Sequence, residues 1–237
     1  MSDAAQTPVK TPAHSINELI DFDIRHSMFR TATRFVDYEM IHGDIIEFGV
    51  YTGRSLALLS HFHESNKRSI HKLDFTRRIV GFDSFDGLPD SDGHPRWKPH
   101  MFSVNHSFHP FCGQGEKVTP DVVHALFEGF DLPRPTIEAG EFSSVLPQVI
   151  GTKYLQAAVV HIDCDIYQST RTVFQGIHPI LQEGTILLFD DWFHFKGRKD
   201  KGEQKAFFEY ADAQEQWKFL EYQAYATFGK SFIVTSR

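Results

Sequence analysis

The sequence predicts an α/β fold with a mostly parallel sheet that ends in an antiparallel hairpin. Short apolar runs, several of them followed by an acid, alternate with segments of helical periodicity, which is the pattern of strands buried on both faces of a parallel sheet. The last two apolar runs, at 217–226 and 231–234, are separated by a short connection, so we expect them to run antiparallel.

The composition indicates one globular domain and excludes several classes of partner. The 237 residues are 41% hydrophobic and 23% charged, as in ordinary soluble domains. A net charge of −7 argues against a nucleic-acid partner, which requires a clustered basic surface. No apolar run approaches the ~18 residues of a membrane-spanning helix. The two cysteines, Cys112 and Cys164, make no disulfide framework, so we expect a cytoplasmic protein.

The amino-terminal residues divide into a tail and a helical cap. Residues 1–14 are polar and lack a signal-peptide core, so we expect a disordered tail before a single domain at 15–237. Apolar residues between 15 and 42 recur at helical spacing and predict one or two helices, packed on the sheet edge or over the ligand cleft. The sequence leaves the oligomeric state open and is compatible with a homo-oligomer.

The first predicted strand, at 44–50, runs into a turn that contains two glycines. In the pattern Glu47-x-Gly49-x-x-x-Gly53, the first glycine would let a nucleoside lie against the backbone, and the following helix would offer free amides to an anionic group. A tight turn without a ligand is the simpler explanation of these glycines taken alone. We expect a Gly49→Val substitution to block a cofactor sterically while leaving the fold largely intact.

The second and third predicted strands also end beside candidate ligand-binding residues. The run 78–84 contains Asp83 at its end, and in nucleoside-binding α/β units such an acid accepts hydrogen bonds from ribose hydroxyls. Capping of the following loop is the alternative role. A third strand at 135–140 is followed by Glu141 and Phe142, which their position places near a nucleobase; an ordinary surface loop explains them nearly as well.

Residues 85–117 lack periodicity and are rich in glycine, proline and aromatic residues, which is typical of a functional loop or lid. We expect this lid-like insertion to cover the cofactor and the acceptor and to become ordered when they bind. Its histidines and Cys112 could instead hold zinc, but their spacing matches no tight ligand pattern. These histidines are His94, His100, His106 and His109.

Four carboxylates follow the two most apolar runs. Asp163 and Asp165 follow one run, and Asp190 and Asp191 follow the next, with a helix predicted at 167–181 between them. Both strands of such a unit end at the same edge of the sheet, where open α/β sheets bind ligands. Unpaired, so many charges would repel one another or take up protons, and a hard divalent cation with oxygen ligands would remove that cost. We therefore predict a metal site here.

Four motifs occur along the chain in this order: Glu47-Phe48-Gly49-Val50-Tyr51-x-Gly53-x-Ser55, Phe82-Asp83-Ser84-Phe85-Asp86-Gly87-Leu88-Pro89, His161-Ile162-Asp163-Cys164-Asp165-Ile166-Tyr167-x-Ser169-Thr170, and Asp190-Asp191-Trp192. Together they resemble the macrocin O-methyltransferase (TylF-like) family of class I S-adenosylmethionine-dependent methyltransferases, over roughly residues 43–237. The resemblance implies a Rossmann-like fold with a mostly parallel seven-stranded sheet and helices on both faces. It also implies methyl transfer to a hydroxyl of a small molecule, a sugar or a glycosylated natural product, with S-adenosylmethionine and Mg²⁺.

The resemblance assigns roles to particular residues. It implies that Asp163, Asp190 and Asp191 hold Mg²⁺ and that Asp165, or Asp163 itself, is the general base. A base beside Mg²⁺ should have a lowered pKa, because the cation favours the ionised carboxylate. The residues expected to contact the cofactor are Glu47, Gly49, Val50, Tyr51, Gly53, Ser55, Asp83, Ser84, Glu141, Phe142 and Asp163.

Two other functions fit parts of the sequence. Asp163-Cys164-Asp165 is an Asp-x-Asp pattern that could hold Mg²⁺ and the diphosphate of a nucleotide-sugar, as in a glycosyltransferase, but this reaction leaves Asp190 and Asp191 unexplained. A cofactor-binding module without catalysis is the other alternative. The four acids argue against it, because a non-catalytic site gains nothing from their mutual repulsion.

Overall fold

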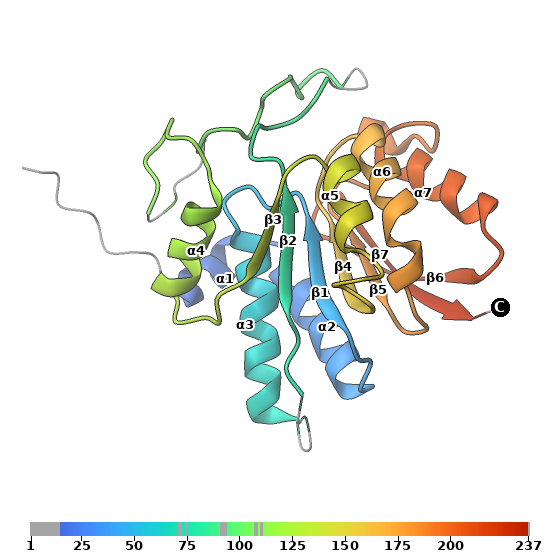
Figure 1. The fold of residues 1–237 in the computed structure, drawn as a ribbon, viewed down its shortest axis with the longest axis horizontal. Helices are drawn as coiled ribbons and strands as arrows, with labels where there is room; N and C mark the ends of the chain where they lie inside the picture. The colour runs from blue at the N-terminus through green and yellow to red at the C-terminus, as the bar shows by residue number, and fades with distance from the viewer. Residues whose placement is uncertain are drawn as a thin grey trace, which may run out of the picture.

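One seven-stranded sheet forms the centre of the computed structural model, which describes residues 15–70, 73, 75–90, 94–106, 109 and 111–236 (Figure 1). The strand order is β3-β2-β1-β4-β5-β7-β6; β7 runs antiparallel to both of its neighbours, and the other neighbouring pairs are parallel. The predicted α/β fold with its carboxyl-terminal hairpin is confirmed. The expected disordered tail lies outside the described residues. The strands are β1 Asp44–Phe48, β2 Ile79–Asp83, β3 Thr136–Ala139, β4 Ala157–Ile162, β5 Ile186–Phe189, β6 Trp217–Tyr225 and β7 Gly229–Ser236.

Helices cover both faces of this sheet. Helices α1 to α4 pack on one face and α5 to α7 on the other, each layer enclosing its own apolar core. The predicted amino-terminal cap consists of the two helices α1 and α2. In the described part of the chain, no helix is both long and apolar enough to cross a membrane. The helices are α1 Ile16–Phe22, α2 His26–Tyr38, α3 Arg54–Ser69, α4 Pro120–Gly129, α5 Phe142–Val149, α6 Tyr167–Ile177 and α7 Gly202–Ala213, with short 3-10 turns η1 His178–Ile180 and η2 Phe195–Gly197.

Alternation along the strands decides which helical layer each side chain reaches. In β1, Ile45 belongs to the core under α1 to α4, whereas Ile46 belongs to the core under α5 to α7. Glu47 and His161 are paired neighbours on β1 and β4 and share the side of Ile45. His161 accordingly packs edge-on against Phe29 of α2, with 5.0 Å between the ring centroids. Acids that continue this alternation past a strand end can reach one layer or the other.

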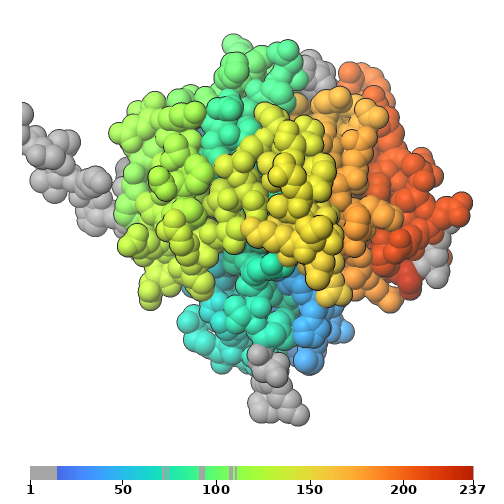
Figure 2. All heavy atoms as spheres, viewed as in Figure 1, coloured from blue at the N-terminus to red at the C-terminus, as the bar shows by residue number. Residues whose placement is uncertain are grey.

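The loop after β2 rises beyond the carboxyl ends of the strands, at the top of the molecule in Figures 1 and 2. Its described residues contain no helix or extended strand, in agreement with the irregular segment predicted at 85–117. The loop folds back on itself through an isolated bridge between Val104 and Lys117. The hydroxyl of Tyr51 donates to the carbonyl of Val104 at 3.0 Å and accepts from the amide of His106 at 2.6 Å. That the loop becomes ordered on ligand binding stays a prediction.

A buried ionic network fixes α2 against α3 and the segment before β2. Asp37 accepts hydrogen bonds from Nε of Arg77 at 2.8 Å and from Nδ2 of Asn66 at 2.9 Å. It also lies 3.0 Å from Nδ1 of His63, and the side chains of Asp37 and Arg77 are fully buried. Burial raises the pKa of Asp37, but the bonds from His63, Arg77 and Asn66 outweigh burial and lower it below its ordinary 3.8. The network thereby holds the helix whose first turn reaches the carboxyl edge of the sheet.

We expect Asp37→Asn to lower the free energy of unfolding by about 3–5 kcal/mol at neutral pH, because Arg77 would remain buried without its carboxylate. The lowered pKa means that wild-type protein loses this contribution as the pH falls below 3.8 and through the folded-state pKa, so the gap between the two proteins should close. Urea unfolding at a series of pH values measures both effects. Asp212→Asn, on the exposed surface of α7, is the control. A gap that widens toward acid pH would contradict the assignment.

Candidate active site

A cavity of about 550 Å³ opens at the carboxyl edge of the sheet, a size suited to a small-molecule ligand. It is lined by the turn between α1 and α2, the loop after β1, the start of the lid, and the residues that follow β2 to β5. All the predicted site residues line it except Glu47 and Gly53. Those that do are Gly49, Val50, Tyr51, Ser55, Asp83, Ser84, Glu141, Phe142, Asp163, Asp165, Asp190 and Asp191.

Gly49 follows β1 with a φ of +89°, a conformation that favours glycine. A Cβ at this position would overlap the backbone carbonyl oxygen of Asp163, which follows the neighbouring strand. Glycine is therefore required for the close approach of β1 and β4, and the expectation that Gly49→Val leaves the fold largely intact is wrong. Gly53 is similar, since its φ is +82° and a Cβ would lie 2.7 Å from Cγ1 of Val123 in α4.

Asp83 holds the loop after β1. Its Oδ2 accepts hydrogen bonds from the N–H groups of Val50 at 2.7 Å and Tyr51 at 2.8 Å, and its Oδ1 accepts one from Phe85 at 2.7 Å. Burial raises the pKa of Asp83, although these three bonds favour the carboxylate. The capping role offered as the alternative is thus present. A carboxylate has about four acceptor positions, so a bond from a ribose hydroxyl remains compatible with this geometry and stays a prediction.

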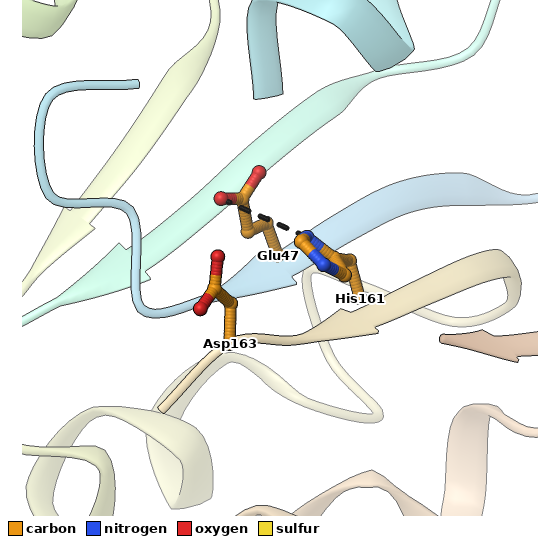
Figure 3. A group of neighbouring side chains, drawn as sticks. All are labelled: Glu47, His161 and Asp163. Carbon is orange, nitrogen blue, oxygen red and sulfur yellow. Dashed lines mark ion pairs between the residues drawn. The ribbon is translucent and has the colours of Figure 1, made fainter. Parts of the chain in front are cut away.

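Glu47 does not line the cavity but contacts Ser55, which does. It is fully buried, accepts a hydrogen bond from Oγ of Ser55 at 2.5 Å and lies 3.8 Å from Nδ1 of His161 (Figure 3). Figure 3 shows Asp163 beside this pair, and ligand atoms of Glu47, His161 and Asp163 lie within 4.8 Å of one another. Burial lowers the pKa of His161, but Glu47, Asp163 and Asp190 together raise it above its ordinary value. Glu47 thus acts on the site through Ser55, at the start of α3, and through His161; its contact with a cofactor stays a prediction.

The structure brings the three predicted metal ligands together. Ligand atoms from Asp163, Asp190 and Asp191 lie within 4.8 Å of one another. Backbone hydrogen bonds continue the sheet past the strand ends, from the amide of Asp163 to the carbonyl of Phe48 at 2.9 Å and from the amide of Asp190 to the carbonyl of Ile162 at 3.0 Å. The parallel register therefore fixes the backbone positions of these acids.

A cation that the sequence analysis missed lies in this cluster. Arg25 immediately precedes α2, and its Nη1 donates to Oδ2 of Asp163 at 2.9 Å and to Oδ2 of Asp190 at 3.0 Å. Asp23 holds the other side of the guanidinium, 3.0 Å from Nε and 2.8 Å from Nη2. Burial lowers the pKa of Arg25, but Asp190, Asp23 and Asp163 raise it well above its ordinary value, so the group stays charged. The sequence signal for this contact was the helical cap predicted at 15–42, which was expected either on the sheet edge or over the ligand cleft.

Asp191 contacts the opposite helical layer. Its Oδ1 lies 3.0 Å from Nε2 of His194, and its amide donates to Oε2 of Glu203 in the first turn of α7 at 3.0 Å. Burial and the charge of Asp191 raise the pKa of Glu203 well above its ordinary value. Among the described atoms, Oδ2 of Asp191 and Oε1 of Glu203 are buried without a hydrogen-bond partner. The sequence analysis also missed Glu203, because an acid in a first helical turn is ordinary.

Asp165 lines the cavity beside these acids, with a φ of +63°. Such a backbone costs a non-glycine residue about 1–2 kcal/mol and is found disproportionately at functional sites. Burial and the charges of Asp191 and Asp163 raise the pKa of Asp165 well above its ordinary value. The lowering expected beside Mg²⁺ would therefore have to come from the charge of the ion, because the protein groups alone have the opposite effect.

The donor set fits a hard divalent cation. Mg²⁺ is commonly bound through one or two carboxylates together with waters, and Asp163, Asp190 and Asp191 present carboxylates at one edge of the cavity. The buried Oδ2 of Asp191 is an oxygen whose bonding capacity such an ion would satisfy. Arg25 already uses one oxygen each of Asp163 and Asp190.

The lid adds an apolar wall to the cavity. Leu88, Pro89, Trp97 and Phe102 line it, and Trp97 packs against His194 with 5.0 Å between the ring centroids. This placement supports a covering role for the lid. In the described part of the chain, the groups of three or more close metal-binding side chains are the two acid-containing clusters above, and neither includes a lid histidine.

Comparison with known proteins identifies the family. Residues 22–214 match the model of the family described as Macrocin-O-methyltransferase (TylF). The chain belongs to this family. A curated relative from Streptomyces olivaceus, 8-demethyl-8-(2,3-dimethoxy-alpha-L-rhamnosyl)-tetracenomycin-C 4'-O-methyltransferase, is 27% identical over 157 residues, which are 64% of this chain and 54% of the relative. The chain thus spans about half the length of the curated relative that it matches.

Two solved structures support the fold of this TylF-family chain. The O-methyltransferase NovP has a TM-score of 0.67 at 21% identity, covering 90% of this chain and 80% of NovP. An O-methyltransferase from Bacillus cereus, solved in complex with SAH, has a TM-score of 0.58 at 14% identity, covering 92% of this chain and 90% of its own. The Rossmann-like class I methyltransferase fold that the sequence motifs imply is therefore confirmed.

We expect Gly49→Ala to destabilise this TylF-family fold by clearly more than Gly151→Ala. Gly151 has a comparable φ of +76°, but a Cβ there would meet nothing within 4 Å, so its substitution should cost only the ~1–2 kcal/mol of a left-handed alanine. At Gly49 the overlap with the carbonyl of Asp163 adds to this cost. Thermal and urea unfolding of the two variants make the comparison. Equal losses would show that the close approach of β1 and β4 relaxes without penalty.

Proposed function

We propose that this protein is an S-adenosylmethionine- and Mg²⁺-dependent O-methyltransferase that acts on a sugar hydroxyl of a small molecule or natural-product glycoside. The observation that carries the proposal is a single cavity that joins the turn at Gly49 to the carboxylates. A methyl donor bound along the turn and a hydroxyl held at Asp163, Asp165, Asp190 and Asp191 would meet in the same space. Membership of the TylF family supports this combination.

Two relatives support the choice of donor and acceptor class. The Streptomyces olivaceus enzyme is named for methylation of a rhamnosyl tetracenomycin, and the Bacillus cereus structure holds SAH. The chain matches about half of the first relative and shares only the fold with the second, so both assignments belong to the proposal. The residues that would hold donor and acceptor come from the cavity of this chain.

When bound, S-adenosylmethionine supplies a methyl group on a cationic sulfur, and Mg²⁺ would supply a Lewis acid at Asp163, Asp190 and Asp191. The protein has to hold the acceptor oxygen, the methyl carbon and the sulfur in line. Asp83 accepts hydrogen bonds from the backbone amides of Val50 and Tyr51 and so fixes the loop after Gly49. A methyl donor bound along this loop would therefore be held in a defined position. The aromatic lid wall lines the cavity beside it and would help to exclude water once both ligands are bound.

The acceptor must lose a proton as its oxygen bonds to the methyl carbon and the carbon–sulfur bond breaks. Asp165 and Asp163 both line the cavity and are the candidates to accept this proton. Burial and the neighbouring acids raise the pKa of Asp165, and positive charge close to it would favour its ionised form. The three neighbouring carboxylates are placed to gather that charge.

A nucleotide-sugar glycosyltransferase is the second candidate, favoured by the Asp163-x-Asp165 pattern. The cavity places Asp190 and Asp191 in the same cluster and joins the cluster to the Gly49 turn. Methyl transfer gives a role to all of these features, whereas glycosyl transfer accounts for the first pair alone. Family membership also favours methyl transfer.

The proposed partner is a small molecule in the cytoplasm. Cys112 and Cys164 are both free and buried, as expected for a reducing compartment. The net charge of −7 makes binding to a polyanion such as nucleic acid unfavourable.

Calorimetry with S-adenosylmethionine and a methyl-transfer assay on a rhamnosylated acceptor test the proposal. A chelator should stop methyl transfer and barely alter S-adenosylmethionine binding, because the ion serves the acceptor. Asp190→Asn should lower Mg²⁺ affinity and turnover together while the protein stays folded. Binding of a nucleotide-sugar in place of S-adenosylmethionine would refute the proposal that S-adenosylmethionine is the donor. Full activity with every divalent ion removed would refute the dependence of methyl transfer on Mg²⁺.

We expect Asp165→Asn to keep Mg²⁺ affinity and to slow methyl transfer by roughly 10²–10⁴-fold, as expected when a general base is lost. Single-turnover mass spectrometry of the methylated product measures the rate, and calorimetry measures the metal. Asp86→Asn is a matched control, since this side chain is 71% exposed and lies outside the cavity. If Asp165→Asn instead lost the metal and kept the rate at saturating Mg²⁺, Asp165 would be a ligand and Asp163 the base.

A further inference from the structure

Arg25 gives the acid cluster an internal cation. Its Nη1 is shared between Oδ2 of Asp163 and Oδ2 of Asp190, while Asp23 holds Nε and Nη2. One nitrogen thus faces the cluster and the other two face the turn between α1 and α2. The side chains of Arg25 and the two cluster acids are only 20–23% exposed, so water screens the contact weakly.

A divalent ion cannot use the same oxygens while this contact persists. With Mg²⁺–oxygen distances of about 2.0–2.1 Å, an ion bound to both Oδ2 atoms would lie within roughly 4 Å of Nη1. Two cations at that separation repel strongly in a partly buried site. The guanidinium also occupies acceptor positions that the ion would need, because each Oδ2 already accepts one of its N–H groups.

We propose that Arg25 and a divalent cation compete for the Asp163–Asp190 pair, so that loading the metal expels Nη1 of Arg25 from the cluster. The inference rests on the Mg²⁺ site of the proposed function and adds a residue that sets how tightly that site binds. In the metal-free protein Arg25 offsets part of the carboxylate repulsion. In the metal-bound protein it keeps Asp23 as its partner, since that pair lies wholly within the turn.

Expulsion of Arg25 would couple the metal to the mouth of the cavity. Phe22, which ends α1, and Ile24, in the turn that carries Arg25, line the cavity and are 72% and 63% exposed. Release of Nη1 removes the two hydrogen bonds by which Arg25 ties this turn to the acids that follow β4 and β5. Metal loading should therefore loosen the turn between α1 and α2.

Titration calorimetry with MgCl₂ alone, on protein freed of metal, tests the competition. We expect Arg25→Gln to bind Mg²⁺ at least about tenfold more tightly than wild type, because the ion no longer breaks charge-assisted hydrogen bonds. The matched control is Arg54→Gln. Arg54 lines the same cavity and is influenced by Asp23, but it has no ion pair with the cluster acids. The Arg54→Gln variant should raise the affinity for Mg²⁺ much less, because it acts only through the long-range loss of one positive charge. A gain in affinity also shows that the variant is folded.

Amide hydrogen exchange of wild-type protein provides the second readout. The amide of Arg25 donates to Oδ1 of Asp23 at 2.9 Å, and we expect this turn to exchange faster when Mg²⁺ is bound. Unchanged affinity in Arg25→Gln, an equal gain in Arg54→Gln, or unchanged exchange in the turn would each overturn the competition while leaving the metal site standing. Failure of both wild type and Arg25→Gln to bind Mg²⁺ would overturn the metal site itself and the competition with it.

Discussion

The convergence of carboxylates at the ends of β4 and β5 is the constraint on which the rest of the site depends. Parallel pairing of the two strands forces Asp163 and Asp190 to leave the sheet side by side, whatever else the chain does. Several negative charges in a partly buried space repel one another strongly unless positive charge is brought to them. Arg25 supplies that charge from the α1–α2 turn, and His194 lies against Asp191. The amino-terminal cap therefore supplies positive charge to the acids as well as apolar side chains to the core.

Strand alternation explains how this charge is delivered. Asp163 continues the parity of His161, whose ring packs against α2, so it points toward the layer from which Arg25 reaches in. Asp191 contacts Glu203 of α7 in the other layer. The acids at one sheet edge are thus divided between two environments, one that contains a guanidinium and one that contains a further buried carboxylic acid. In the second environment, Oδ1 of Asp191 and Oε2 of Glu203 have partners, whereas Oδ2 of Asp191 and Oε1 of Glu203 have none among the described atoms.

Local periodicity made the elements and the edge of the sheet predictable. The predicted strands and helices were recovered within a few residues, because buried strands and amphipathic helices leave patterns that depend only on near neighbours. Arg25 lies 138 positions from Asp163, and no local pattern specifies such a pair. The role of Gly49 was misjudged for a related reason. A glycine is required at position 49 because a Cβ there would overlap the carbonyl oxygen of Asp163, which follows the neighbouring strand. Spacing along the sequence does not reveal this contact.

Tyr51 shows that the loop after β1 and the lid are built as one unit. Its amide donates to Asp83, whereas its hydroxyl bonds to the backbone of Val104 and His106 in the lid. Asp83 therefore fixes a residue that in turn anchors the lid. Gly49, two positions earlier, packs directly on the backbone of Asp163, so the same short loop also abuts the acid cluster. A ligand that displaced this loop would disturb the lid and the acids together. The three parts of the site are consequently expected to respond as a unit, through the side chains of Asp83 and Tyr51 and the close backbone approach of Gly49 to Asp163.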